Sequence, residues 1–207
     1  MKKNFKTLLS VGLVLMMFIS TYSIVNAENQ LSQNEIQIKE NLEKMYYGDI
    51  DHYTVYDFDG NVVTNEFYIK TKSDFINQNY GGIVNYMKDN RISTIEIDYS
   101  SETSSSTRAE APLDRSVNRT FIHNSDGGSE SGSIWLITTY IRGTYVYYPN
   151  TDSFGENNVS WSYTKSNTVY INKYSFTNSK SGTYLKFKLE LQIEEKNYTQ
   201  HNYIDEC

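Results

Sequence analysis

The chain has 207 residues, a net charge of −6 and a single cysteine, so an internal disulfide is excluded. The acidic balance disfavours binding to nucleic acid through its phosphates, and no cluster of lysine or arginine stands out. Nineteen tyrosines, nine phenylalanines and two tryptophans, against only three alanines and two prolines, favour strands over helices.

Residues 1–27 have the three parts of a secretory signal peptide. Three lysines precede an apolar run from Leu8 to Ile19, and Ala27, with a valine two residues before it, gives the small-residue pattern that a signal peptidase reads. The run is about twelve residues, short of the roughly twenty that span a bilayer, and no second apolar run follows, so we expect no stable membrane span. We predict a secreted, extracellular protein that starts at Glu28; an uncleaved N-terminal anchor is the alternative.

Residues 28–99 are predicted to form a small α+β domain. Apolar residues at helical intervals indicate a helix from Gln33 to Tyr47, which Gly48 ends. Asp59-Gly60 between two β-rich runs predicts a hairpin over residues 53–70. A second amphipathic helix follows from about residue 73 to 87, weakened in its middle by two glycines, and alternating apolar residues predict a strand from Arg91 to Tyr99.

Residues 100–112 are rich in serine and threonine and contain almost nothing to bury. This composition predicts a linker and places a domain boundary here. Arg108 in such a segment also suggests a processing site, but a plain linker explains the same residues.

Residues 113–207 are predicted to form an all-β domain. Turn residues separate runs of alternating polarity, and in the last run Leu185, Phe187, Leu189, Leu191 and Ile193 share one face. This number of strands predicts an antiparallel two-sheet β-sandwich of about immunoglobulin size, following the α+β region. The predicted strands are 116–123, 133–141, 144–148, 159–164, 168–177 and 183–195, with Arg142-Gly143 as a tight turn that makes 133–148 a hairpin.

Four acidic residues in two loops form a candidate calcium site. If 133–148 is a hairpin, the loops 124–132 and 149–157 lie at the same end of the sandwich. Carboxylate oxygens are ligands that Ca²⁺ prefers. Solvated polar loops without a cofactor are the alternative. The candidate metal ligands are Asp126, Glu130, Asp152 and Glu156.

Val55 to Glu66 fits an EF-hand calcium loop in part. Asp57, Asp59 and Gly60 fall at its third, fifth and sixth places, but the first place, which requires a carboxylate, is valine. A simple Asp-Gly hairpin explains the same residues.

The excess of aromatic residues suggests a second kind of site. Tyr145, Tyr147, Tyr148 and Trp161 are the candidate ligand-binding residues for a platform that contacts sugar rings or a peptide. The alternative is that these rings are core and cross-strand pairs of the sandwich.

The sequence gives no specific support for an enzyme. His123 lies near Ser125 and Asp126, but neighbours in a loop rarely supply the geometry of a triad, and Cys207 has no secured base. We therefore expect a non-enzymatic bacterial binding module that contacts a cell-surface polymer or protein through the loop edge of its sandwich. A secreted toxin or membrane-active protein with residues 28–111 as a pro-segment is the alternative. The odd cysteine, Cys207, predicts either a disulfide-linked dimer or an idle thiol.

Overall fold

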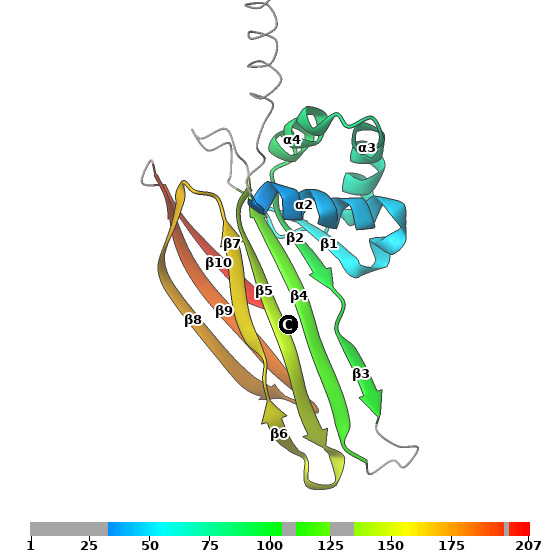
Figure 1. The fold of residues 1–207 in the computed structure, drawn as a ribbon, viewed down its shortest axis with the longest axis vertical. Helices are drawn as coiled ribbons and strands as arrows, with labels where there is room; N and C mark the ends of the chain where they lie inside the picture. Colours follow the sequence, from blue (N-terminus) through cyan, green and yellow to red (C-terminus); the bar gives the residue numbers. More distant parts are fainter. Residues whose placement is uncertain (1–32, 105–110, 125–134, 197–198) are drawn as a thin grey trace, which may run out of the picture. The chain divides into compact units, whose positions relative to one another are not determined.

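The structure is a computed structural model that describes residues 33–104, 111–124, 135–196 and 199–207. The part from Gln33 to Cys207 forms one compact unit. It is mostly antiparallel β-structure in two sheets with a short N-terminal helical region, so the predicted class, an α+β region followed by a sandwich-like all-β region, is confirmed (Figure 1).

The N-terminal region combines helices with two strands. Its first helix and its second strand lie where the sequence predicts them, and Gly48, with φ at +147°, ends the first helical segment. The elements are α2 (Gln33–Lys44), η1 (Met45–Asp49), η2 (Ile50–His52), β1 (Tyr53–Asp57), α3 (Thr64–Ile76), α4 (Tyr80–Asp89) and β2 (Ile92–Asp98).

The predicted hairpin over residues 53–70 is wrong in its second arm. The Asp59-Gly60 turn is present, with Gly60 at a φ of +82°, but α3 begins at Thr64. Its buried side chains, Phe67, Thr71 and Phe75, recur every four residues, which is the period of a helix packed on one face. Tertiary packing of this face therefore outweighs the β-rich composition of the segment.

The predicted helix over residues 73–87 is two helices. Between α3 and α4, Gln78 adopts a left-handed φ of +56°. The Asn79 side chain then accepts a hydrogen bond from the Gly82 amide at 3.2 Å and caps α4. The break therefore lies just before the two glycines.

The larger sheet has seven strands. Their order is β1-β2-β4-β5-β6, with β3 also paired to β4 and β7 also paired to β5. The new strands are β3 (Ser101–Ser104), β4 (Leu113–Asn124), β5 (Trp135–Tyr148), β6 (Ser153–Asn157) and β7 (Ser160–Lys165), with the short helix η3 (Pro149–Thr151) before β6.

This sheet runs across the predicted domain boundary. Residues 101–104 of the predicted linker form β3, and residues 105–110 lie outside the described part. Because β2 pairs with β4 from Thr94↔His123 to Asp98↔Arg119, strands from both predicted domains share one ladder. The hydroxyl-rich segment is a strand because β4 offers it a free edge, which its composition does not reveal.

The predicted hairpin over residues 133–148 is wrong. β5 is one continuous strand from Trp135 to Tyr148. Its outer edge pairs with β7 up to Arg142 and with β6 from Tyr145, and Gly143 lies at the change of partner with φ at +146°. A Cβ at Gly143 would lie 2.4 Å from the Asn158 carbonyl oxygen, so glycine permits a close backbone approach here.

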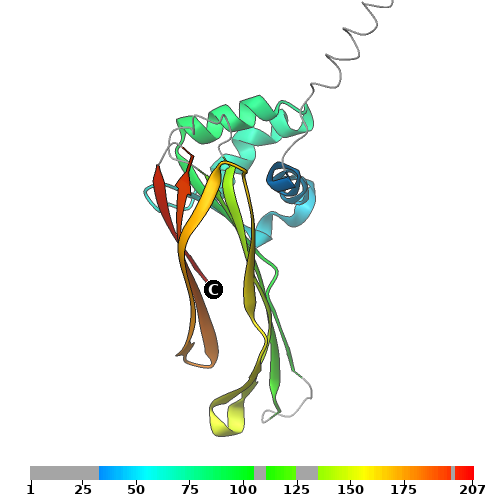
Figure 2. The same cartoon turned by 60° about the vertical axis from the view of Figure 1, so that its left-hand side comes forward.

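The smaller sheet has three strands in the order β10-β9-β8 and faces the larger sheet as a second layer (Figure 2). These strands are β8 (Val169–Ser181), β9 (Tyr184–Glu195) and β10 (Gln200–Glu206). The alternation predicted for β9 is confirmed, since Phe187, Leu189, Leu191 and Ile193 are buried while Lys186 and Glu190 are exposed.

Both faces of the larger sheet are covered in part. Figure 2 shows α2 on the face that points away from the smaller sheet. One core packs the helices on β1, β2 and Ile122, while two further clusters lie between the sheets around Phe121, Phe187 and Ile193. No helix in the described ranges is long and apolar enough to cross a membrane.

Candidate functional site between the two sheets

Three of the four predicted aromatic ligand residues lie on β5, and two of them belong to the core. Tyr145 and Tyr147 are 4% and 5% exposed, and both pack on Phe154. Tyr148 is exposed and its ring packs over Gly155, where a Cβ would lie 2.5 Å away. Because alternate residues of a strand point to opposite faces, Tyr148 and the two buried rings do not form one surface.

Trp161, the fourth predicted residue, lies at the opposite edge of the sandwich from β10. It is half-buried and contacts the exposed rings of Tyr163 and Tyr174, with centroids 5.7 and 4.9 Å away. This small cluster joins the edge strands β7 and β8.

The predicted calcium site depends on a hairpin over residues 133–148, and this hairpin is absent from the described residues, where β5 is one strand. Asp126 and Glu130 lie outside the described residues, between Asn124 and Trp135 at one end of β5. Asp152 and Glu156 follow the other end of β5, whose 14 extended residues span roughly 45 Å. Asp152 accepts hydrogen bonds from Lys180 Nζ at 2.6 Å and the Tyr147 hydroxyl at 3.0 Å. Nowhere in the described ranges do three or more His, Cys, Asp or Glu side chains gather as metal ligands.

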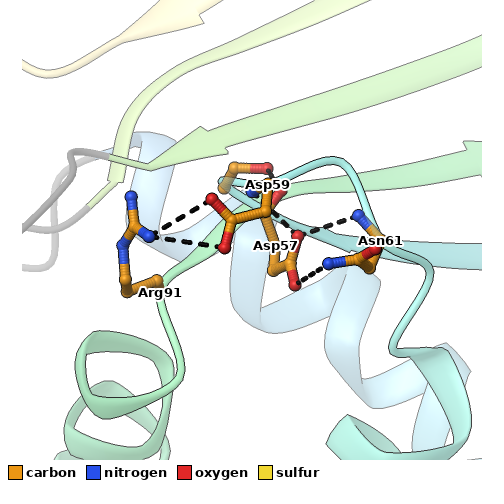
Figure 3. Close-up of polar contacts among 5 residues, drawn as sticks. Asp57, Asp59, Asn61 and Arg91 are labelled. Atoms are coloured by element: carbon orange, nitrogen blue, oxygen red, sulfur yellow. Dashed lines mark hydrogen bonds and ion pairs between the residues drawn. The ribbon is translucent and has the colours of Figure 1, made fainter.

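The segment with partial EF-hand spacing is a turn whose polar groups form hydrogen bonds with one another (Figure 3). The Asp57 carboxylate accepts hydrogen bonds from the Asp59 and Asn61 amides and from the Asn61 side chain, at 2.8–2.9 Å. These donors, chiefly those of Asn61, lower the pKa of Asp57. Asp59 pairs with Arg91 at 3.3 Å. The simple turn therefore accounts for both aspartates.

Two adjacent cavities lie between the sheets along the β10 side, and they share Glu206. The C-terminal pocket, of about 670 Å³, is lined by residues that include Glu102, Arg115, Arg119, Tyr184, Lys186 and Cys207. The histidine pocket, of about 590 Å³, is lined by residues that include Tyr56, Glu96, Phe121, His123, Tyr203 and Asp205.

The C-terminal pocket lies beside the start of β9, next to the last described pairs of its ladder with β10. Cys207 closes the ladder by exchanging two backbone hydrogen bonds with Phe187, at 2.8 and 3.0 Å. In an antiparallel pair the next backbone groups on this side belong to Leu185 and Thr183. Of the described strands, only β8 pairs with this part of β9. Within the described ranges, the start of β9 therefore has no strand partner on the β10 side.

Side chains from the larger sheet contact this free edge. The Leu185 amide donates a long hydrogen bond of 3.4 Å to the Tyr145 hydroxyl. The Thr183 carbonyl accepts a hydrogen bond from the Arg115 guanidinium. Arg115 is almost fully buried, pairs with Glu102 at 2.8 Å, and lies over the Tyr184 ring with 3.7 Å to the centroid. The pocket thus has a fixed cation beside an unpaired strand edge.

The C-terminal pocket is richer in cations than the chain as a whole. Its lining contains three cations, Arg115, Arg119 and Lys186, against two carboxylates, Glu102 and Glu206, which gives a formal charge of +1 in a chain of −6. Arg119 is held by Glu96 and by Asp98, the latter at 2.9 Å. Lys186 pairs with Glu206 at 2.5 Å, so each of the three cations has a carboxylate partner with which an acidic ligand would compete.

Cys207 lines the same pocket as a half-buried thiol. Burial raises its pKa to about 12. Because the thiolate is the form that makes disulfides, this burial disfavours the predicted dimer through Cys207, which no observation tests directly.

The histidine pocket contains a buried pair from two sheets. His123 on β4 and Asp205 on β10 are 2% and 1% exposed, and His123 Nε2 lies 2.9 Å from Asp205 Oδ1. Thr94 Oγ1 lies 3.2 Å from His123 Nδ1, and the Thr139 hydroxyl donates to Asp205 Oδ2 at 2.5 Å. The sequence suggests Ser125 and Asp126 as neighbours of His123, but the described partners of His123 come from distant strands.

Comparisons of this chain with known proteins identify no relative. No protein family, no curated protein and no solved structure gives a significant match to this chain.

Proposed function

We propose that the protein is a secreted binding module that takes an extended peptide segment of a cell-surface protein as an added strand beside β9. The observation that supports this proposal is the start of β9, Tyr184 to Lys186, with Thr183 in the turn before it. This segment borders the C-terminal pocket and, among the described residues, has no strand partner on the β10 side. The secretion in this proposal rests on the signal peptide predicted for residues 1–27. The ligand site differs from the loop edge that the sequence suggests.

Strand addition uses backbone hydrogen bonds for affinity and side-chain pockets for specificity. An incoming strand antiparallel to β9 would replace the long contact between the Leu185 amide and the Tyr145 hydroxyl with a standard ladder bond. It would also offer the Thr183 carbonyl a backbone donor. Thr183 and the first three residues of β9 lie along this edge, which corresponds to roughly 13 Å of extended chain.

The lining of the pocket indicates the composition of the peptide. Val117, Tyr145 and Leu185 supply apolar surface between the sheets, and the cations outnumber the carboxylates. Alternate side chains of a bound strand point to opposite faces, so one set would meet the apolar surface. We therefore propose a peptide in which apolar residues alternate with at least one acidic residue.

Binding without catalysis is the function that these residues support. Arg115 and Arg119 are engaged in ion pairs with carboxylates, and burial keeps the Cys207 thiol neutral at physiological pH. The toxin with residues 28–111 as a pro-segment has less support. Removal of residues 28–111 would take β1, β2 and β3 from the larger sheet and would uncover the buried Ile122.

The test is a selection of random octapeptides displayed on phage, followed by calorimetric titration of the synthetic peptides. Selected peptides are expected to show alternating apolar positions and an acidic residue. N-methylation of the alternate backbone amides that face β9 should abolish binding, because it removes ladder donors. Lys186→Glu should weaken binding about tenfold by reversing a charge at the pocket.

Lys173→Glu is the matched control, since Lys173 is an exposed residue on the far edge strand β8. It should leave the affinity unchanged. Equal binding of methylated and unmethylated peptides would show that no strand is added. A selection that yields no peptide sensitive to Lys186→Glu would also reject the proposal.

A further inference from the structure

The histidine pocket differs in charge from its neighbour. Its described lining residues include four carboxylates, those of Asp57, Glu96, Asp205 and Glu206, and no lysine or arginine. Three of them already have partners: Asp57 binds its own turn, Glu96 pairs with Arg119, and Glu206 pairs with Lys186 at 2.5 Å. Asp205, beside His123 and Thr139, is the carboxylate left to attract a positively charged solute.

Two buried polar atoms in this pocket lack an aligned hydrogen bond. His123 Nε2 and Asp205 Oδ1 are 2.9 Å apart, yet neither atom makes a hydrogen bond to any described residue. Both side chains are at least 98% buried and both line the cavity. An unsatisfied carboxylate oxygen in such a place costs free energy until a donor reaches it.

Aromatic rings complete the lining. The Tyr203 ring stacks on the His123 imidazole with centroids 4.1 Å apart, and Tyr56 and Phe58 line the opposite wall from β1 and its turn. At the outer end of this wall, the Arg91 guanidinium lies 5.9 Å from the Phe58 centroid. Ring faces beside carboxylates attract guanidinium and ammonium groups.

We propose that the histidine pocket binds an organic cation, a guanidinium or ammonium group that lies against Phe58 and Tyr203 and donates a hydrogen bond to Asp205 Oδ1. The cavity of about 590 Å³ is in the range of sites for small molecules or single long side chains. The proposal is independent of peptide binding at β9, because the two pockets share only Glu206 among their described lining residues.

The test is calorimetric titration with two guanidinium probes, free agmatine and the capped tripeptide Ac-Gly-Arg-Gly-NH2. The control ligand is Ac-Gly-citrulline-Gly-NH2, which has nearly the same shape as the arginine peptide and no charge. We expect both cations to bind and the citrulline peptide not to bind. Tighter binding of agmatine would indicate a free amine as the ligand, and tighter binding of the arginine peptide would indicate a protein side chain.

Variants assign the binding to this pocket. Asp205→Asn removes the buried charge at constant size and should weaken binding about tenfold. Phe58→Leu, at a position outside the three hydrophobic cores, should weaken it about two- to tenfold through loss of the ring face. Glu190→Gln on the exposed face of β9 is the control and should bind as the parent does.

Circular dichroism checks that each variant is folded. If Asp205→Asn does not fold, the affinity of Phe58→Leu alone tests whether the cation binds in this pocket. The proposal is overturned if neither cation binds, if the citrulline peptide binds as tightly as the arginine peptide, or if folded variants of the pocket bind like the parent protein.

Discussion

Arg115 connects the two sheets at the end of the sandwich that holds the C-terminal pocket. It reaches from β4 to Glu102 on β3 and to the Thr183 carbonyl in the turn between β8 and β9. Its planar group also lies between the rings of Tyr184 and Tyr147, at 3.7 and 5.2 Å from their centroids. A flat group with several fixed donors suits these contacts, and lysine offers neither property.

We expect Arg115→Leu to lower the free energy of unfolding by about 2–4 kcal/mol, because the Thr183 carbonyl and Glu102 lose a buried partner. Arg115→Lys should recover part of this loss. Urea unfolding followed by circular dichroism measures both. Lys188→Gln is the control; it removes an exposed ion pair with Glu190 and should change stability by less than about 0.5 kcal/mol. A loss at Arg115 as small as that of the control would contradict a connecting role.

The sequence gives no sign of this role. The partners of Arg115 are 13 and 68 residues away, and the chain contains no motif that relates them. The same holds for His123 and Asp205, which meet only because β4 and β10 belong to facing sheets. Tyr145 was a candidate from the sequence as a ligand platform, but it is buried and caps the β9 edge instead.

At the scale of the elements, Gly143 determines how β5 continues past its change of partner. We expect Gly143→Ala to lower the free energy of unfolding by about 2–4 kcal/mol. The new Cβ would collide with backbone atoms at Asn158 and Val159, and an L-residue is strained at a φ of +146°. Differential scanning calorimetry measures the change.

Gly81→Ala is the matched control for this prediction. Gly81 lies in α4, and the nearest atom to an added Cβ is 3.8 Å away. This substitution should stabilise the protein by about 0.4–1 kcal/mol, because alanine is the better helix former. If both substitutions change stability equally, β5 tolerates a side chain at Gly143 and the steric argument fails.

Elements with a strong period were predictable, and elements defined by their partners were not. β9 shows its buried face in the sequence because every second residue from Phe187 to Ile193 is apolar. β6 and β10 are edge strands with few apolar residues, so their sequences resemble loops. Arg142-Gly143 resembles a hairpin turn, since glycine serves both turns and close backbone approaches.

At the scale of the whole molecule, burial of phenols and of the thiol makes the fold sensitive to alkali. Burial raises the pKa of Tyr46 and of Cys207 to about 12, and it also raises the pKa values of Tyr53 and Tyr203. The ordinary pKa values are near 10 for tyrosine and near 9 for cysteine. Between about pH 9 and pH 12 the unfolded chain therefore loses protons that the folded chain keeps.

We expect the free energy of unfolding to fall as the pH rises above about 9. Each buried group contributes a slope of up to about 1.4 kcal/mol per pH unit. Urea titrations at several pH values, with tyrosinate absorbance at 295 nm as a second readout, measure this fall. Tyr46→Phe should make the fall shallower. A stability that is unchanged up to pH 11 would contradict the burial of these groups.

The two predicted domains share one sheet. β2 and β4 pair side by side, Glu96 and Asp98 bind Arg119 across the ladder, and Ile122 belongs to the core beneath the helices. We expect a chain whose residues 105–110 are replaced by a site-specific protease sequence to stay associated after cleavage. The two fragments should elute together in size-exclusion chromatography and separate only in denaturant. If the C-terminal fragment instead elutes alone with the circular dichroism of folded β-structure, the shared sheet contributes little, and a removable pro-segment becomes the better explanation of residues 28–111.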